Sequence, residues 1–364
     1  MNRIRLIVSD LHLSRGRYLS DRTKNILEDF IHDREFSEFL QYYSSGDYAT
    51  VPVELILNGD IFDLLQMDTF GVHTHLITER SVVRNLQRIV KGHPEFFEAL
   101  RVFVKQPGKS LVYVVGNHDV GMLWDQPRAF LKEVCEAHIE FRDISYEFDG
   151  IYVEHGQQYE GFARFDPNRP FLTRGLPEPV LNLPWGSQFV AVCLPKIKQQ
   201  RPHIDKTRPF QTFVRWAFLH DFFWSLKTVG VALNFVFQTL LFKNRFQVRG
   251  GVQNTFALLK EVTIYPNYDK VAMKILDSRP DLHIVIFGHT HILRFRQHKE
   301  GKLYINEGTW SEVTSLDLSD YGTRTRLTYV LAETHDSEQQ AGEKTTKAQL
   351  KEWKGRWKPE TDVL

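Results

Sequence analysis

Cysteine is nearly absent from this sequence of 364 residues, which contains only Cys135 and Cys193. Two cysteines exclude a disulfide framework and a metal site built from several thiolates. Apolar runs long enough to span a membrane are also lacking, since the stretch Val229–Phe242 has 14 residues and a spanning helix needs about 20. The chain enters the strand-like run Ile4–Val8 with no apolar segment and cleavage site before it, so we expect a cytoplasmic protein without a signal peptide.

Net charge is small, at +1, but it is distributed unevenly along the chain. Residues 161–250 contain 13 Lys and Arg against 4 Asp and Glu, a balance of +9, so the rest of the chain must sum to −8. The overall composition, with 42% hydrophobic and 25% charged residues, is typical of a folded globular protein. We therefore expect the basic segment to face something anionic.

Short strand-like runs recur along the chain, and most of them lead into a cluster of polar residues. These runs are Ile4–Val8, Val53–Leu57, Leu111–Val115, Ile151–Val153, Leu282–Phe287 and Leu303–Ile305, with Thr328–Leu331 as a last strand. Helical patterns over residues 22–43, 81–104 and 128–138 lie between the early runs. Strands that alternate with helices predict an α/β fold with a buried sheet. In such folds the loops at the carboxyl ends of the strands build the site.

Residues 161–248 interrupt this alternation and read as a helical, basic and aromatic cap insertion. The catalytic domain would then consist of residues 1–160 and 249–334, and residues 335–364 would form a polar C-terminal tail. Leu350, Trp353 and Trp357 recur at i, i+3 and i+7, which predicts one short docked helix in that tail.

The cap contains 11 Phe and Trp between Phe210 and Phe246, in a segment with excess positive charge. Aromatic residues at this density commonly serve packing between domains, and that interpretation stays open. A small pair of helices has little interior for so many rings, however, and exposed apolar patches mark binding surfaces. We expect residues 210–246 to bind acyl chains or to contact an anionic membrane peripherally, on its inner face.

The polar clusters at the strand ends contain carboxylate, amide and imidazole groups. These residues are Asp10, His12, Asp60, Asn117, His118, His155, His289 and His291. Pairs spaced i, i+2 can point both side chains at one centre, because alternate residues of an extended chain share a face. Ligands of these types without sulfur suit Mn²⁺, Fe or Zn²⁺. There are enough of them for two divalent ions about 3.5–4 Å apart that share one carboxylate.

The order of these clusters resembles the signature of the calcineurin-like metallophosphoesterases. The matching pieces are "DLH" at 10–12, "GDIFD" at 59–63, "GNHD" at 116–119, His155 and "GHTH" at 288–291. The resemblance involves about 200 residues outside the insertion, and all five pieces occur in the family's order. It implies a four-layer αββα sandwich with a helical cap insertion and a hydrolase with two metal ions, for which we expect Mn²⁺, with Fe or Zn²⁺ as alternatives.

The metal ligands that the resemblance implies form two sets joined by one carboxylate. The first set consists of Asp10, His12 and His291. The second set consists of Asn117, His155 and His289. Asp60 would bridge the two ions together with a hydroxide.

The resemblance also implies the groups that handle the proton. His118 would not bind metal but would act as general acid towards the leaving oxygen. Asp119 would hold the imidazole of His118 in place, and Asp63 would support the neighbouring ligands from outside.

Within the family, the position of the insertion resembles that of the hydrophobic helical lid of the UDP-2,3-diacylglucosamine hydrolases. Those enzymes cleave a pyrophosphate bond in a nucleotide that carries two acyl chains, and a basic, aromatic lid suits such a phosphorylated and acylated substrate. His118 is a departure, because those hydrolases have arginine within an otherwise similar Gly-Asn-x-Asp block. The departure argues against that enzyme itself and favours another hydrolase of a lipid-linked phosphoester or pyrophosphate.

Two other functions stay open on the sequence. A phosphodiesterase or nuclease could use the basic segment to grip a polyanion and its aromatic residues to stack bases, although the uncharged stretch Val229–Phe242 suits nucleic acid poorly. A non-catalytic binding module on the same fold is the second alternative, but no ligand of the family pattern is missing here.

Overall fold

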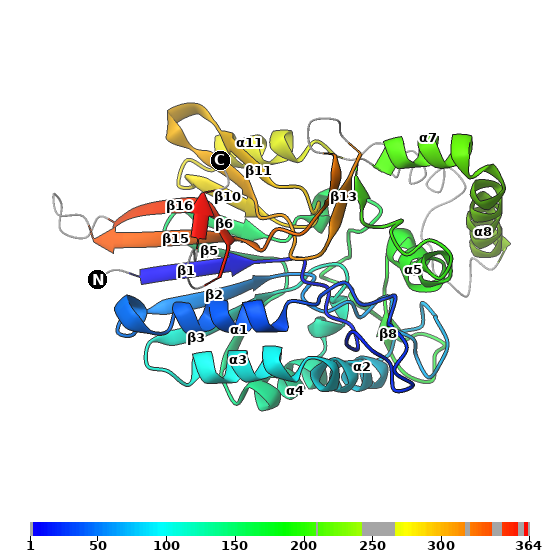
Figure 1. Ribbon diagram of the computed structural model, residues 1–364, viewed down its shortest axis with the longest axis horizontal. Helices are drawn as coiled ribbons and strands as arrows, with labels where there is room; N and C mark the ends of the chain where they lie inside the picture. The colour runs from blue at the N-terminus through cyan, green and yellow to red at the C-terminus, as the bar shows by residue number, and fades with distance from the viewer. Residues whose placement is uncertain are drawn as a thin grey trace.

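The computed structural model describes residues 3–208, 210–241, 266–316, 321–336, 344–355 and 360–362 of the chain. Two β-sheets form the centre of the molecule, and helices cover the outer face of each sheet (Figure 1). The predicted α/β sandwich of four layers is confirmed.

The larger sheet has seven strands in the order β17-β16-β15-β1-β2-β3-β4. In that order the strands are Glu360–Asp362, Lys344–Trp353, Thr328–Asp336, Arg3–Val8, Val53–Asn58, Lys109–Val114 and Ile139–Arg142. Strands β1 to β4 are parallel, whereas β15, β16 and β17 pair antiparallel with their neighbours. The loops that follow the parallel strands therefore leave the sheet at one edge.

The smaller sheet has five strands in the order β11-β12-β10-β6-β5. In that order the strands are Arg294–Gln297, Leu303–Asn306, Ile284–Phe287, Ile151–Glu154 and Ser145–Phe148. Its central strands β6, β10 and β12 are parallel, and β11 and β5 pair antiparallel at the two edges.

Apolar clusters join the four layers. Ile7, Ile56 and Val112 of the larger sheet pack with Ile286 and Ile305 of the smaller sheet between the two. The outer face of the larger sheet is covered by α1 (Asp33–Tyr42), α2 (Glu79–Gly92), α3 (Pro94–Val104) and α4 (Asp125–Cys135). Helix α11 (Tyr268–Ser278) covers the smaller sheet. Because both faces of β2 are covered, every residue of this strand is buried, which explains its apolar run Leu55–Leu57.

The cap contains four described helices after short strands β7 (Phe171–Leu172) and β8 (Val180–Leu181). These helices are α5 (Trp185–Val192), α6 (Leu194–Lys198), α7 (Phe210–His220) and α8 (Phe222–Leu241). They surround a core of their own that includes Trp185, Ile197 and Phe235. Between α6 and α7, β9 (Thr207–Arg208) pairs with β13 (Val313–Ser315), which also pairs with β14 (Gly322–Arg324). None of the described helices is both long enough and apolar enough to cross a membrane.

The prediction of a docked helix in the C-terminal tail is wrong. Leu350 and Trp353 lie in strand β16, which pairs with β15 within the larger sheet. Alternate residues of a strand point to opposite faces, so Leu350 enters the core between the sheets while Trp353 enters the core beneath the helices. Leu350 and Trp353 are therefore apolar because each packs in a different core, and they do not share one face of a helix. Trp357 lies outside the described residues.

Two predicted helices also have different bounds. The pattern over residues 22–43 contains a helix only from Asp33, and the pattern over residues 81–104 divides at His93 into α2 and α3. Pro94 occupies the first turn of α3, where its missing N–H costs nothing, but it could not continue α2. The predicted boundary of the cap at residues 248 and 249 lies outside the described residues.

Candidate metal centre

Every predicted ligand lies in a loop that directly follows a parallel strand. Asp10 and His12 follow β1, Asp60 follows β2, and Asn117 follows β3. The smaller sheet contributes His155 after β6, and His289 and His291 after β10. The loops of both sheets therefore meet at one end of the sandwich, which the rule for strand ends predicts.

The structure brings six of the seven predicted ligands into groups whose donor atoms lie within 4.8 Å of one another. The groups are Asp10, His12 and His291; His12, Asp60 and His118; and Asp60, His155 and His289. Asp60 shares one group with His12 of the first predicted ligand set and another with His155 and His289 of the second set. It therefore lies between the two sets, which is the position of the predicted bridging carboxylate. The metal-binding roles themselves stay predictions.

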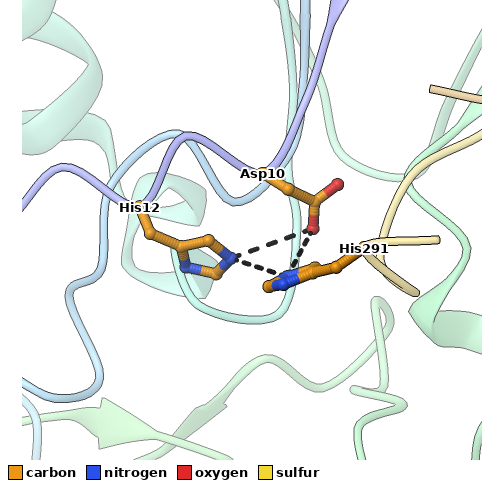
Figure 2. A group of neighbouring side chains, drawn as sticks. All are labelled: Asp10, His12 and His291. Carbon is orange, nitrogen blue, oxygen red and sulfur yellow. Dashed lines mark hydrogen bonds and ion pairs between the residues drawn. The ribbon is translucent and has the colours of Figure 1, made fainter. Parts of the chain in front are cut away.

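Figure 2 shows the first group, in which three side chains from two loops point toward one another. The Nε2 atoms of His12 and His291 are 3.0 Å apart, and Oδ1 of Asp10 lies 3.2 Å from Nε2 of His291. Nε2 of His12 lies 3.8 Å from the same Asp10 oxygen. Two imidazole nitrogens and a carboxylate oxygen at these separations are an arrangement that one divalent cation can join.

The third group, Asp60, His155 and His289, is organised around Asp60. Nε2 of His155 lies 3.1 Å from Oδ2 of Asp60. The other ring nitrogen of His155, Nδ1, lies 2.9 Å from the carbonyl oxygen of Asn58. A carbonyl can only accept, so Nδ1 must carry a proton, and Nε2 is the nitrogen left to bind a metal.

Three buried atoms at the centre make no hydrogen bond with any described residue. They are Oδ1 of Asp10, Oδ1 of Asn117 and Nε2 of His155. Buried polar atoms are normally paired, and leaving one unpaired costs free energy. Divalent cations bound by these oxygen and nitrogen atoms would give each of the three a partner.

The electrostatics of the cluster also favour cations. Burial raises the pKa of Asp10, but His155 and His291 outweigh it and lower this pKa to about 2. Conversely, burial lowers the pKa of His155, but the carboxylates of Asp60 and Asp10 raise it to about 10. The ionised carboxylates thus hold a proton on His155, and a metal ion would compete for that position.

Five of the seven predicted ligands have a left-handed backbone conformation. Asp10, His12, Asp60, His289 and His291 have φ values between 52° and 67°. Residues other than glycine rarely adopt this backbone conformation, and those that do concentrate at functional sites. These tight turns direct consecutive loop residues into the centre.

Glycines of the motif leave room for the carboxylates. A Cβ atom added at Gly116 would clash with the side chain of Asp60, and one added at Gly288 would clash with that of Asp10. The backbone N–H of His118 donates to Oδ1 of Asp60 over 2.7 Å, and that of His289 donates to Oδ2 of Asp10 over 2.9 Å. Each loop therefore fixes a carboxylate that comes from another strand.

His118 lies beside this centre, 15% exposed, with its ring hydrogen-bonded to a carboxylate. Nδ1 of His118 lies 2.8 Å from Oδ1 of Asp63. Burial lowers the pKa of His118, but Asp60 and Asp63 outweigh it and raise this pKa to about 9. The imidazole is therefore protonated at neutral pH, as a general acid requires.

The prediction that Asp119 orients His118 is wrong, because Asp63 does so. The carboxylate of Asp119 accepts three hydrogen bonds, from the hydroxyl of Tyr113 over 2.6 Å and from the N–H groups of Gly116 and Ile61 over 2.6 and 2.9 Å. The Asp119 side chain therefore points away from His118, and its hydrogen bonds stabilise the loop that contains both residues.

Two buried carboxylates close to the centre, Glu160 and Glu307, are missing from the sequence prediction. Oε2 of Glu160 lies 2.6 Å from Nε2 of His289, so Glu160 fixes the orientation of this predicted ligand. Glu307 is buried, and its Oε1 accepts a hydrogen bond from Nδ2 of Asn58 over 2.6 Å. Burial raises the pKa of Glu307 to about 8. Because Glu307 follows strand β12, the rule for strand ends could have found it, whereas Glu160 gave no such signal.

A cavity of about 290 Å³ connects the centre with the cap. His12, Asp60 and His118 line one part of it. The rest has an apolar wall from the cap, made of Phe162, Phe189, Leu194, Ile197, Ile204 and Phe210. Charged side chains of both signs complete the lining, with Lys206 and Arg208 beside Asp29, Asp205 and Glu312.

Comparison with known proteins shows the family of the chain. A family model described as calcineurin-like phosphoesterase matches residues 5–293. Among solved structures, the chain is similar to a protein described as a predicted phosphoesterase from Streptococcus pneumoniae TIGR4, at 12% identity and a TM-score of 0.29, with 96% of this chain and 89% of that chain covered.

Two further solved structures have similar coverage. Vacuolar protein sorting 29 from Cryptosporidium parvum is 13% identical with a TM-score of 0.29, with 96% of this chain and 97% of that chain covered. A dimetal phosphatase from Danio rerio is 11% identical with a TM-score of 0.36, with 94% of this chain and 98% of that chain covered. No curated protein matches the chain.

Proposed function

Because the chain belongs to the calcineurin-like phosphoesterase family, we propose that it hydrolyses a phosphoester or pyrophosphate bond in a lipid-linked substrate. The observation that carries the lipid part of the proposal is the cavity, in which the candidate metal centre and an apolar wall of the cap face the same space. A phosphoryl group at the centre would place an attached acyl or isoprenoid chain against that wall.

The chain's own residues divide the work of this reaction. Asp10, His12 and His291 would hold one divalent ion, and Asn117, His155 and His289 would hold the other, with Asp60 between them. When bound, two such ions neutralise phosphoryl oxygens and lower the pKa of bound water to about 7. Protonated His118, held by Asp63, would donate its proton to the leaving oxygen.

Arg208 in the cavity lining supports an anionic substrate with an apolar part. Lys206 is ion-paired with Asp29, whereas the guanidinium of Arg208 donates to the backbone carbonyl oxygens of Asp205 and Thr207. A second phosphate group or a sugar phosphate would therefore find the charge of Arg208 in the same lining as the candidate metal ligands. An apolar wall gives no comparable advantage to a polynucleotide, whose backbone is charged at every residue. The lipid-linked substrate is therefore favoured over nucleic acid.

Asp60 provides the test of the metal-dependent hydrolase. Asp60→Asn should lose at least about 100-fold of the activity toward an aryl phosphodiester with Mn²⁺ present, because it removes the bridging charge. Bound metal, measured by elemental analysis after dialysis, should fall in the same variant. The exposed carboxylate of Asp47 provides the matched control, since Asp47→Asn should change neither quantity. A wild-type chain that binds no divalent ion and hydrolyses no diester would instead be a non-catalytic binding module.

The substrate class is tested with a series of phosphodiesters that differ only in acyl chain length. Longer chains should lower KM in the wild type, because each buried CH₂ group adds about 0.8 kcal/mol of binding free energy. Phe189→Ser polarises the apolar wall of the cavity and should remove most of this dependence while leaving the shortest substrate unaffected. A KM that is independent of chain length in the wild type would exclude a lipid-linked substrate but not hydrolysis itself.

A further inference from the structure

The outer face of α8 carries a stripe of exposed apolar side chains. Phe222, Leu226, Val229, Leu233 and Phe237 follow one another at intervals of three or four residues, so they share one side of the helix. Their exposed fractions lie between 37% and 61%. The stripe therefore runs along the helix from its first turn to near its end.

Helix α7 and the corner that joins it to α8 extend this stripe. Trp216 and Leu219 of α7 are 51% and 80% exposed, and Phe223 at the start of α8 is 85% exposed. Figure 1 places both helices at the end of the molecule that lies farthest from the N-terminus of β1. The apolar stripe and these three residues are called the α7–α8 face below.

Packing within the cap does not require these side chains. The opposite side of α8 already fills the core of the cap, where the ring of Phe235 lies 5.5 Å from that of Trp185. A helix that is apolar on all sides is normally buried on all sides. Within the described part of the chain the α7–α8 face is open to solvent, so it is of the kind that binds a partner.

The charges around this face have one sign. Arg215 and Lys227 are exposed, and the only acidic residue in the sequence from 210 to 241 is Asp221, which is ion-paired with Arg201. Exposed aromatic and aliphatic side chains flanked by cations are typical of helices that lie in the surface of an anionic bilayer. A twofold dimer through the same face would bring copies of Arg215 and Lys227 close to each other, which disfavours a second copy of the chain as the partner.

We propose that the α7–α8 face lies in the surface layer of an anionic lipid bilayer, as an interfacial contact that does not span it. The inner sides of the same helices reach the cavity of the candidate metal centre, because Phe210 of α7 and Thr228 of α8 line it. The cap thus joins the bilayer surface to the metal centre. This inference concerns binding alone, and its test does not require hydrolysis.

Vesicle flotation with the full chain tests the contact. Wild type should float with vesicles of phosphatidylcholine and phosphatidylglycerol in equal parts, and less with phosphatidylcholine alone. The triple variant Phe223→Ser, Leu226→Ser, Leu233→Ser should bind at least about tenfold more weakly, because it removes three large apolar side chains from the contact. Arg215→Gln combined with Lys227→Gln should weaken binding to the anionic vesicles by about tenfold and leave the weak binding to phosphatidylcholine unchanged.

A matched control replaces exposed apolar residues elsewhere on the surface. The variant Tyr18→Ser, Val102→Ser, Tyr321→Ser removes three side chains of similar exposure and should float as wild type does. The proposal is overturned if wild type fails to float, or if the triple variant of α8 floats as well as wild type. It is also overturned if light scattering finds a dimer that this variant dissociates while neither protein binds vesicles, because a second copy then covers the face.

Discussion

His118 lies close to two carboxylates, Asp60 and Asp63, which have different predicted roles. Asp60 is the predicted bridge between metal ions, so bound cations would offset most of its negative charge. Asp63 is fully buried and hydrogen-bonded to Nδ1 of His118 over 2.8 Å, and it belongs to none of the candidate metal groups of the described residues. Once metal is bound, Asp63 is therefore the carboxylate that keeps His118 protonated.

Asp63→Asn should move the alkaline limb of the pH–rate profile to lower pH. The pKa of His118 is about 9 when Asp60 carries its full charge. With cations on Asp60, Asp63 is the carboxylate that holds this pKa above its usual value, and the acid form is lost as pH rises through the pKa. An amide at position 63 can still accept from Nδ1 but carries no charge, so the pKa should fall by roughly one unit or more. The measurement is kcat against pH for a diester with a poor leaving group.

His118→Asn provides the control for this prediction, because it removes the titrating group. It should retain bound metal, lose this alkaline limb, and lower kcat more for poor leaving groups than for good ones. An unchanged alkaline limb in Asp63→Asn, or equal losses for both kinds of leaving group in His118→Asn, would contradict the assignment of His118 as the acid.

The sequence predicted which side chains gather at the centre, because strand ends position them. It did not predict the partner of His118. Asp119 is its neighbour in the chain, whereas Asp63 lies 55 residues away, and side-chain direction decides between them. The turn from Gly116 to Asp119 sends the carboxylate of Asp119 toward Tyr113, and a motif gives no information on that direction.

At the scale of elements, His93 ties three segments of the catalytic domain together. It occupies the junction between α2 and α3, and its exposed fraction is 1%. Nδ1 lies 2.9 Å from the carboxylate of Asp33 in the first turn of α1, and Nε2 lies 3.2 Å from that of Glu28. Burial lowers the pKa of His93, but these two carboxylates outweigh it and raise this pKa to about 9.

His93→Gln should reduce the free energy of unfolding in a pH-dependent way. The folded-state pKa of about 9 exceeds the usual histidine pKa of 6.5, so the stabilisation is complete below 6.5 and is lost as pH rises through 9. The shift corresponds to a loss on the order of 3 kcal/mol at about pH 6 and to a much smaller one at about pH 10. Denaturant unfolding at both pH values measures the difference.

The exposed His138 provides a control for this pH dependence, since His138→Gln should leave unfolding unchanged at both values. A loss of equal size at both pH values would attribute the effect of His93→Gln to packing and not to its charge.

The sequence predicted the buried strands better than the helix bounds. Strands such as β2 are mostly apolar and end at polar motifs, so their position is evident. The sequence predicted a helix where strand β16 lies, because Leu350 and Trp353 are three residues apart, as on one face of a helix. In the strand the same two residues point to opposite faces and enter two different cores. Its place beside β15 depends on contacts between segments that no local pattern encodes.

At the scale of the whole molecule, a buried ion network joins the cap to the catalytic domain. Lys198 of α6 is fully buried, and its Nζ lies 2.6 Å from Asp205 and 3.2 Å from Asp29. Asp29 precedes α1 and also pairs with Lys206 over 2.8 Å. The two carboxylates, chiefly that of Asp205, outweigh burial and raise the pKa of Lys198 well above its usual range, so the network stays charged at all physiological pH values.

Lys198→Met should loosen the cap on the catalytic domain without emptying the metal centre. The substitution removes the cation beside Asp205 and one of the two cations beside Asp29. Breaking a buried ion pair by removing one partner typically costs about 3–5 kcal/mol. Hydrogen–deuterium exchange should therefore rise in α5, α6 and β9, while the strands β1, β2 and β3 stay protected and bound metal is unchanged. Because Lys196 is exposed in the same helix, Lys196→Met should leave exchange as in wild type. If Lys198→Met instead raised exchange equally in the cap and in these strands, the network would stabilise the fold as one unit, and the cap could not open separately to admit a lipid-linked substrate.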